Sequence, residues 1–171
     1  MLERIWNGWR ASYVSSAGQA DDESADGATG SVFTQILQSG LDDTETNIVH
    51  RGEHCFAILN AFPYGTGHLL VLPYREVANL EDLTTDETTE LWGLVTEAVR
   101  AIKQAYTPEG INVGINLGRP AGGSVSEHLH VHVVPRWTGD ANFMTAVANT
   151  RTLPEALVDT ATRIRAAWSG Q

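Results

Sequence analysis

Three histidines in the last third of the chain, His128, His130 and His132, alternate with the apolar residues Leu129 and Val131. Successive side chains of a β-strand point to opposite faces, so this spacing predicts three imidazoles on one face of a strand. Imidazole offers two chemistries near neutral pH, metal ligation and nucleophilic or acid–base catalysis, and the spacing alone permits both. Three buried histidines on one face would repeat a desolvation cost, so the pattern favours a functional site over a structural one.

The residues around this pattern resemble the histidine triad (HIT) superfamily of nucleotide hydrolases and transferases. The resemblance covers residues 47–137 and includes Asn60 and the segments 67–73, 116–118 and 121–125. Within the superfamily the chain is most similar to bacterial diadenosine tetraphosphate phosphorylases. The segments that carry this closer similarity are 63–64, 123–128 and 139–143.

The resemblance implies a role for each matching residue. His130 is expected to attack the α-phosphorus, His132 to donate a hydrogen bond to the α-phosphate, and His128 to order the site. The expected substrate-binding residues are Asn60 for the ribose, Asn116 and Ser124 beside the phosphate, and Gly122 and Gly123 for close backbone approach. Asn60 has an alternative interpretation, since asparagine also begins turns. We expect His68 to lie outside the site, because histidine at a strand start is equally typical of a packed, hydrogen-bonded residue. His50 and His54 are also expected outside it, because no motif surrounds them.

Two departures from the family pattern bear on metal binding and on phosphate contacts. Many bacterial members carry Cys-x-x-Cys and a further histidine as zinc ligands, and Ser31, Thr34 and Glu76 stand at the matching positions here. Two hydroxyls cannot replace two thiolates on zinc, so we predict no metal site and no tightly bound cofactor. Gly123 stands where many members have Gln, and one additional residue precedes His128, so the Ser124 contact is less well defined than the others. The resemblance implies inorganic phosphate as a co-substrate, and a divalent cation can accompany the polyphosphate.

Composition limits the class of partner. The 171 residues are 42% hydrophobic, enough for one core of ordinary size. A net charge of -10, with Lys103 as the single lysine, argues against nucleic acid and fits a small ligand, which the resemblance implies is a nucleotide. The apolar runs are too short to span a membrane, and residues 1–13 lack the pattern of a signal peptide, so we expect a cytoplasmic protein with no membrane partner. The lone Cys55 is interpreted as a core residue.

Hydrophobic spacing predicts the organisation of the chain. An amphipathic helix is expected over 1–14, a flexible linker over 15–30, and a HIT domain with a C-terminal helix over 31–171. Within that domain we predict strands and helices at 48–51, 54–59, 68–73, 84–107, 111–117, 129–135 and 154–168. This order indicates an α+β fold of HIT type, an antiparallel sheet of about five strands with a long helix and a C-terminal helix on one face. The resemblance also implies a homodimer.

The leading hypothesis is an enzyme that cleaves diadenosine tetraphosphate through a covalent nucleotidyl-histidine intermediate, with phosphate as acceptor and ADP and ATP as products. Water as acceptor would instead give AMP and ATP. Three competing hypotheses are a hydrolase of dinucleoside polyphosphates or adenosine phosphoramidates, a non-catalytic nucleotide-binding protein, and a metal site built from the three histidines.

Overall fold

The computed structural model describes residues 30–140 and 155–169. The helix expected over 1–14 and all but the last residue of the linker expected over 15–30 lie outside the described residues. Within the described ranges, no helix combines the length and apolar character needed to cross a membrane.

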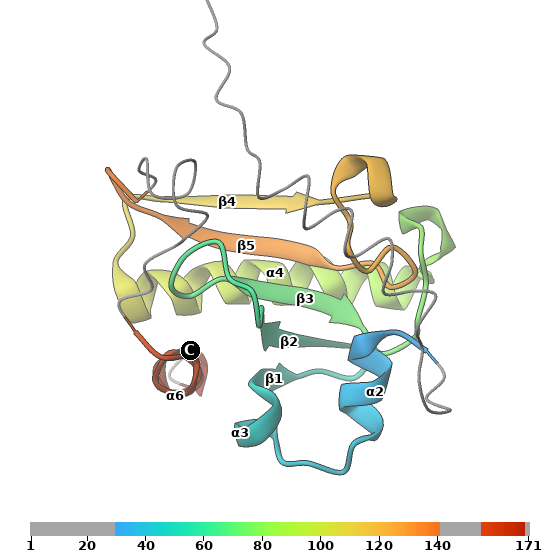
Figure 1. The fold of residues 1–171 in the computed structure, drawn as a ribbon, viewed down its shortest axis with the longest axis horizontal. Coiled ribbons are helices and arrows are strands. Elements are labelled where there is room, and N and C mark those ends of the chain that lie inside the picture. Colours follow the sequence, from blue (N-terminus) through green and yellow to red (C-terminus); the bar gives the residue numbers. More distant parts are fainter. Residues whose placement is uncertain (1–29, 141–154, 170–171) are drawn as a thin grey trace, which may run out of the picture.

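Five antiparallel strands form a single sheet, as the sequence predicts (Figure 1). The strands are β1 (Ile48–Arg51), β2 (Cys55–Leu59), β3 (Leu69–Pro73), β4 (Gly110–Ile115) and β5 (Val131–Arg136), in the spatial order β1-β2-β3-β5-β4. Every residue of β2 and β3 is buried, which agrees with their nearly uninterrupted apolar sequences. Strand β5, which contains His132, therefore lies between the central strand β3 and the edge strand β4.

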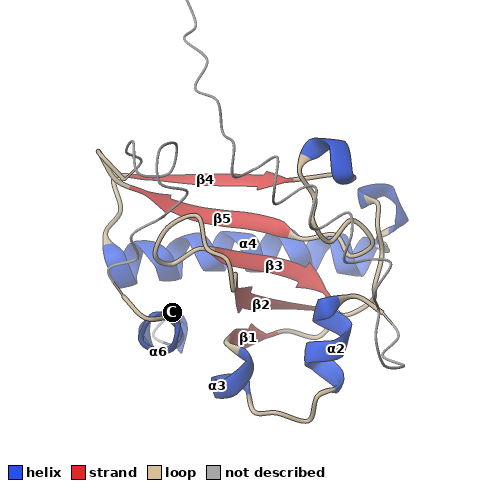
Figure 2. Ribbon diagram, in the orientation of Figure 1, coloured by secondary structure: helices blue, strands red, loops and turns tan. Residues whose placement is uncertain are grey.

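The long helix α4 (Thr85–Tyr106) covers one face of the sheet (Figure 2). It begins with a capping box, in which the Thr84 hydroxyl accepts from the Glu87 amide and the Glu87 carboxylate accepts from the Thr84 amide. Its apolar stripe, which includes Leu91, Ala98 and Ile102, packs against side chains of β2, β3 and β5. The C-terminal helix α6 (Leu157–Ser169) joins the same core and packs beside α4.

A short helix that the sequence did not predict lies on the opposite face of the sheet, whereas the two predicted helices, α4 and α6, share one core as expected. Helix α2 (Val32–Gln38) places Phe33 against Phe56, Leu70 and Leu72. Leu70 and Leu72 alternate along β3 with Leu69 and Val71, which face α4, so α2 must cover the other face. Ser31 is the N-cap of this helix.

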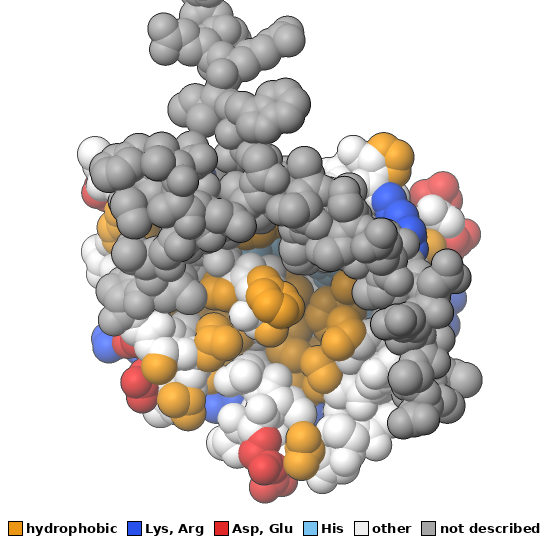
Figure 3. All heavy atoms as spheres, in the orientation of Figure 1, with side chains coloured by type: hydrophobic (Ala, Val, Ile, Leu, Met, Phe, Trp, Pro, Cys, Tyr) orange, Lys and Arg blue, Asp and Glu red, His pale blue; other side chains and the backbone are white. Residues whose placement is uncertain are grey.

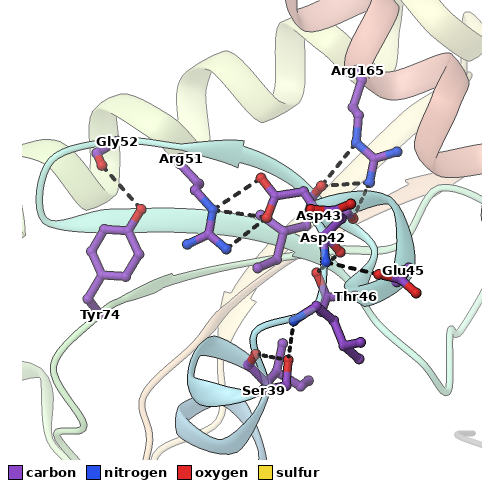
Figure 4. A network of polar contacts seen from close by, with 12 residues as sticks. Ser39, Asp42, Asp43, Glu45, Thr46, Arg51, Gly52, Tyr74 and Arg165 are labelled. Carbon is purple, nitrogen blue, oxygen red and sulfur yellow. Dashed lines mark hydrogen bonds and ion pairs between the residues drawn. The ribbon is translucent and has the colours of Figure 1, made fainter.

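A polar network fastens the C-terminal helix to the β1 edge of the sheet (Figure 4). Arg165 of α6 donates to the backbone carbonyls of Asp43 and Ile48 at 2.6 to 3.0 Å. Asp43 belongs to the short helix α3 (Asp43–Thr46), and its carboxylate pairs with Arg51 of β1 at 2.7 Å. The carbonyls of the first residue of α3 and of the first residue of β1 are thus held by a helix more than a hundred residues further along the chain.

Candidate active site

The register of β5 determines which face the triad occupies. His132 lies opposite Leu70 of β3 and Gly114 of β4, so its side chain projects to the face that α2 partly covers. Leu129, Val131 and Val133 point to the α4 side and join the main core. The rings of His130 and His132 meet edge to face with centroids 4.9 Å apart. His128 and His130 precede β5, which begins at Val131.

His130 is held with a defined proton position. Its Nδ1 lies 2.9 Å from the backbone carbonyl of His128. A carbonyl only accepts, so Nδ1 carries the proton and Nε2 keeps its lone pair. Burial lowers the pKa of His130, which favours this neutral, nucleophilic form near pH 7. His130 is only 6% exposed, so the expected nucleophile is buried. Its ring lies against the Phe33 ring, with centroids 5.5 Å apart.

His132 is oriented by a fourth histidine. His68 is fully buried, and its Nε2 lies 3.0 Å from Nδ1 of His132. The Tyr64 amide donates to Nδ1 of His68 at 3.0 Å, so the proton of His68 is on Nε2 and is donated to His132. His132 then carries its own proton on Nε2. Burial, and secondarily the neighbouring His130, lower the pKa of His132 to about 4. His132 is therefore a neutral donor through Nε2, the property expected of a phosphate contact.

His128 differs from the other two triad members. It is fully buried, its Nε2 lies 2.9 Å from the Pro73 carbonyl, and its Nδ1 lies 2.7 Å from the Ser31 hydroxyl. Both ring nitrogens are thus occupied by protein groups. Burial lowers the pKa of His128, so the ring is neutral near pH 7. This geometry fits a residue that orders the site and leaves no ring nitrogen for a substrate.

The predicted phosphate loop packs beside His132. The Asn116 amide nitrogen lies 3.3 Å from Nε2 of His132, and a half-turn of the terminal amide would put its oxygen there as an acceptor. A Cβ at Gly123 would lie 3.1 Å from the Gly118 carbonyl oxygen, closer than most Cβ contacts, which favours glycine in this tight loop. Gly122, at φ 99°, ends the short 3-10 helix Arg119–Ala121. Ser124 is exposed, and no hydrogen bond joins it to the triad in the described part of the chain.

Asn60 begins a turn, as its alternative interpretation held. Its side-chain oxygen accepts from the Phe62 amide at 3.0 Å, and its amide nitrogen lies 3.4 Å from His68. Two apolar residues near Asn60 could contact a nucleotide base: Phe62 is 75% exposed, but Leu59 packs into the core on the α4 side. Leu59 is therefore excluded from a base contact. Figure 3 shows hydrophobic side chains gathered on the face opposite α4, with histidine atoms beside them.

The residues that match the family's zinc ligands do not form a zinc site. Ser31, Thr34 and Glu76 do lie together with His128, but two of the four offer neutral hydroxyls, and Ser31 is hydrogen-bonded directly to the imidazole. Zinc sites require deprotonated thiolate, imidazole or carboxylate donors. Among the residues that the structure describes, no group of three or more His, Cys, Asp or Glu side chains is arranged to hold a metal ion.

A model of the HIT domain family matches residues 42–139, more than half of the chain. The protein therefore belongs to the HIT family. A Mycobacterium tuberculosis protein named AP-4-A phosphorylase is 45% identical over 170 residues, which cover 99% of this chain and 86% of that protein. The bis(5'-adenosyl)-triphosphatase of Dictyostelium discoideum is 36% identical over 92 residues, covering 54% of this chain and 61% of the relative. A zinc-bound histidine triad protein from Mycobacterium smegmatis superposes with a TM-score of 0.68 at 27% identity, covering 84% of this chain and 96% of that structure.

Sequence reasoning missed two residues of the site. His68 is expected outside the site, yet its ring contacts His132. No local pattern marks Phe33, yet its ring lies 5.5 Å from both His128 and His130. The sequence marks His68 only by its position after Gly67 and directly before the apolar strand β3. Because β3 pairs with β5, this position brings His68 close to His132.

Proposed function

We propose that this protein is a diadenosine tetraphosphate phosphorylase that works through a nucleotidyl-histidine intermediate on His130. One observation carries the proposal: the His128 carbonyl accepts a hydrogen bond from Nδ1–H of His130, which leaves the unprotonated Nε2 as a neutral nucleophile, beside a second imidazole that donates through Nε2. The match of nearly the whole chain to a relative named AP-4-A phosphorylase supports the choice of substrate.

In the first step Nε2 of His130 attacks an α-phosphorus of the dinucleotide. The P–N bond forms as the bond from that phosphorus to the bridging oxygen breaks, and ATP leaves with the electron pair. The Nε2 proton of His132 stabilises the charge that develops on the α-phosphate oxygens. In the second step an oxygen of inorganic phosphate attacks the adenylyl phosphorus, the P–N bond breaks, and ADP leaves while His130 recovers its lone pair.

The remaining predicted residues have supporting roles in this scheme. We assign Asn116, Gly122, Gly123 and Ser124 to the phosphates, because their loop lies next to His132. We assign Asn60 to the ribose and the exposed ring of Phe62 to a base. A divalent cation, where present, would arrive with the polyphosphate.

Product analysis with labelled phosphate tests the proposal. The protein is incubated with diadenosine tetraphosphate, with and without [32P]phosphate, and the nucleotides are separated. We expect ADP and ATP only when phosphate is present, with the label in ADP and none in ATP. AMP and ATP in both incubations would show a hydrolase instead, the activity class of the triphosphatase relative. His130→Ala serves as the control for contaminating enzymes.

We also propose that the protein forms a homodimer through the β4 edge. Val113 of this edge strand is 44% exposed, and together with Val99 and Lys103 of α4 it lines a pocket of about 340 Å³. An exposed edge strand is a template for pairing with another chain. Light scattering should give twice the chain mass, and Val113→Glu should give the monomer mass. Val158→Glu, at an exposed apolar position of α6, is the matched control and should leave the dimer intact.

A further inference from the structure

We propose that Glu76, Thr34 and Ser31 form a positioning network that holds the His128 ring in place. Through the backbone carbonyl of His128, this network orients Nε2 of His130 toward the substrate. The proposal rests on the assignment of His130 as the nucleophile. It gives a function to the residues that stand where relatives have zinc ligands. In this chain a carboxylate and two hydroxyls would do the work of a metal ion.

The network begins at a carboxylate with two donors. One oxygen of Glu76 accepts from the Thr34 hydroxyl at 2.6 Å and from the Ser31 amide at 2.7 Å. These two hydrogen bonds, the one from Thr34 first, lower the pKa of Glu76, so the group is a carboxylate near pH 7. The anion therefore fixes the start of α2, where Ser31 is 2% exposed. The Ser31 hydroxyl in turn accepts from the Thr34 amide at 3.2 Å.

The direction of each proton follows from groups that can only donate or only accept. The Pro73 carbonyl only accepts, so Nε2 of His128 carries that ring's proton. In the neutral ring Nδ1 is then an acceptor, and the Ser31 hydroxyl must donate to it across 2.7 Å. The Thr34 hydroxyl donates its proton to Glu76, so it does not also donate to the Ser31 hydroxyl, which lies 3.2 Å away. The network thus admits one arrangement of protons while His128 is neutral.

The position of the His128 ring controls the nucleophile because the same residue supplies the carbonyl that orients His130. The ring is tied to β3 through Pro73 and to α2 through Ser31, and the Phe33 ring packs against its edge. Phe33 also contacts the His130 ring. Movement of α2 would therefore shift both the carbonyl acceptor and the apolar wall behind His130. Ser31 is a positioning residue in this scheme, since it acts through His128 and does not face the substrate.

Ser31→Ala tests the network by removing the donor to His128. We expect kcat to fall on the order of 10- to 100-fold, the usual effect of removing a partner that orients a functional side chain from behind, with KM unchanged. Ser31→Thr keeps the hydroxyl and should restore kcat. Ser39→Ala is the matched control, because Ser39 caps the other end of α2 through the Ile36 carbonyl and should leave kcat unchanged. Equal losses in the Ser31→Ala and Ser39→Ala variants would reduce the effect to helix stability and overturn the proposal.

A measurement on the unaltered protein tests the network without relying on turnover. Nitrogen-15 spectra of the histidine rings report which ring nitrogen carries the proton. We expect protons on Nε2 of His128 and Nδ1 of His130, and a mixture of His130 tautomers in the Ser31→Ala variant. A protonated Nδ1 on neutral His128, or an unaltered His130 spectrum in the variant, would overturn the proposal. Absence of turnover on diadenosine tetraphosphate would contradict the proposed function, and these spectra would still decide whether the network exists.

Discussion

Replacing Glu87 with glutamine should destabilise the protein near neutral pH and have progressively less effect as the pH falls toward 3. Glu87 accepts from Nε and Nη2 of Arg75 at 2.9 and 2.7 Å and from the Thr84 amide at 2.8 Å. These contacts, the Arg75 bonds first, lower the pKa of the carboxyl from 4.5 to about 2. A folded-state pKa below the unfolded value means that the stabilisation is complete above pH 4.5 and is lost as the pH falls toward 2.

The difference between the folded and unfolded pKa of Glu87 sets the size of the expected stability loss. Lowering the pKa of Glu87 from 4.5 to about 2 corresponds to roughly 3 kcal/mol of unfolding free energy. The Glu87 side chain is only 9% exposed, but Arg75 is 49% exposed and solvent screens its charge. We therefore expect a loss of about 2 kcal/mol in the glutamine variant, which is a fall in melting temperature of roughly 4–8 °C for a chain of this size.

Urea unfolding of both proteins at intervals between pH 7 and pH 3 measures the difference. Glu45→Gln is the matched control, because Glu45 occupies the same position in the capping box of α3, is exposed, and is not bonded to an arginine in the described structure. It should change stability by no more than a few tenths of a kcal/mol. A loss in Glu87→Gln that is equally large at pH 7 and pH 3 would refute an ionic origin.

Three further predictions concern the site. His130→Ala should abolish turnover and retain the far-UV circular dichroism of the fold, and near-normal turnover in the folded variant would refute the nucleophile assignment. Because burial lowers the pKa of both His130 and His132, the single-turnover rate of ATP release should stay constant as the pH falls through 6.5. A loss of rate toward acid pH with its midpoint at or above 6.5 would contradict the assigned tautomers. Ser124→Ala should lower kcat by a factor on the order of 10 to 1,000, as expected for a lost transition-state donor. An unchanged rate would show that the exposed Ser124 lies away from the phosphate.

Local patterns were sufficient for most of the fold. The capping box at Thr84 and Glu87 and the apolar stripe behind it predicted α4 almost to the residue. Short apolar runs bounded by turn residues predicted all five strands to within a few residues. Helix α2 was missed because a seven-residue helix is marginal by itself, and its stability comes from Phe33 packing against a sheet formed by distant segments.

The sequence predicts candidate residues for the site, but it does not predict the contacts between them. The alternation of histidines predicts His128, His130 and His132 on one face of a strand, but it could not show that His128 is fully buried or that His68 reaches His132. The His68–His132 contact spans 64 residues and the Ser31–His128 contact spans 97. Both depend on strand register and on the docking of α2. Neither property is encoded in the local spacing of residues.

The protonation pattern of the site follows from backbone groups. The carbonyls of Pro73 and His128 only accept, and the amide of Tyr64 only donates, so these three groups assign the protons of His128, His130 and His68. His68 then assigns the proton of His132. Replacing one side chain would alter the proton position of one histidine ring, whereas a shift of the backbone would alter the proton positions of several rings together. This is why residues that never reach the substrate, such as those at the start of α2, are expected to influence the reactivity of His130.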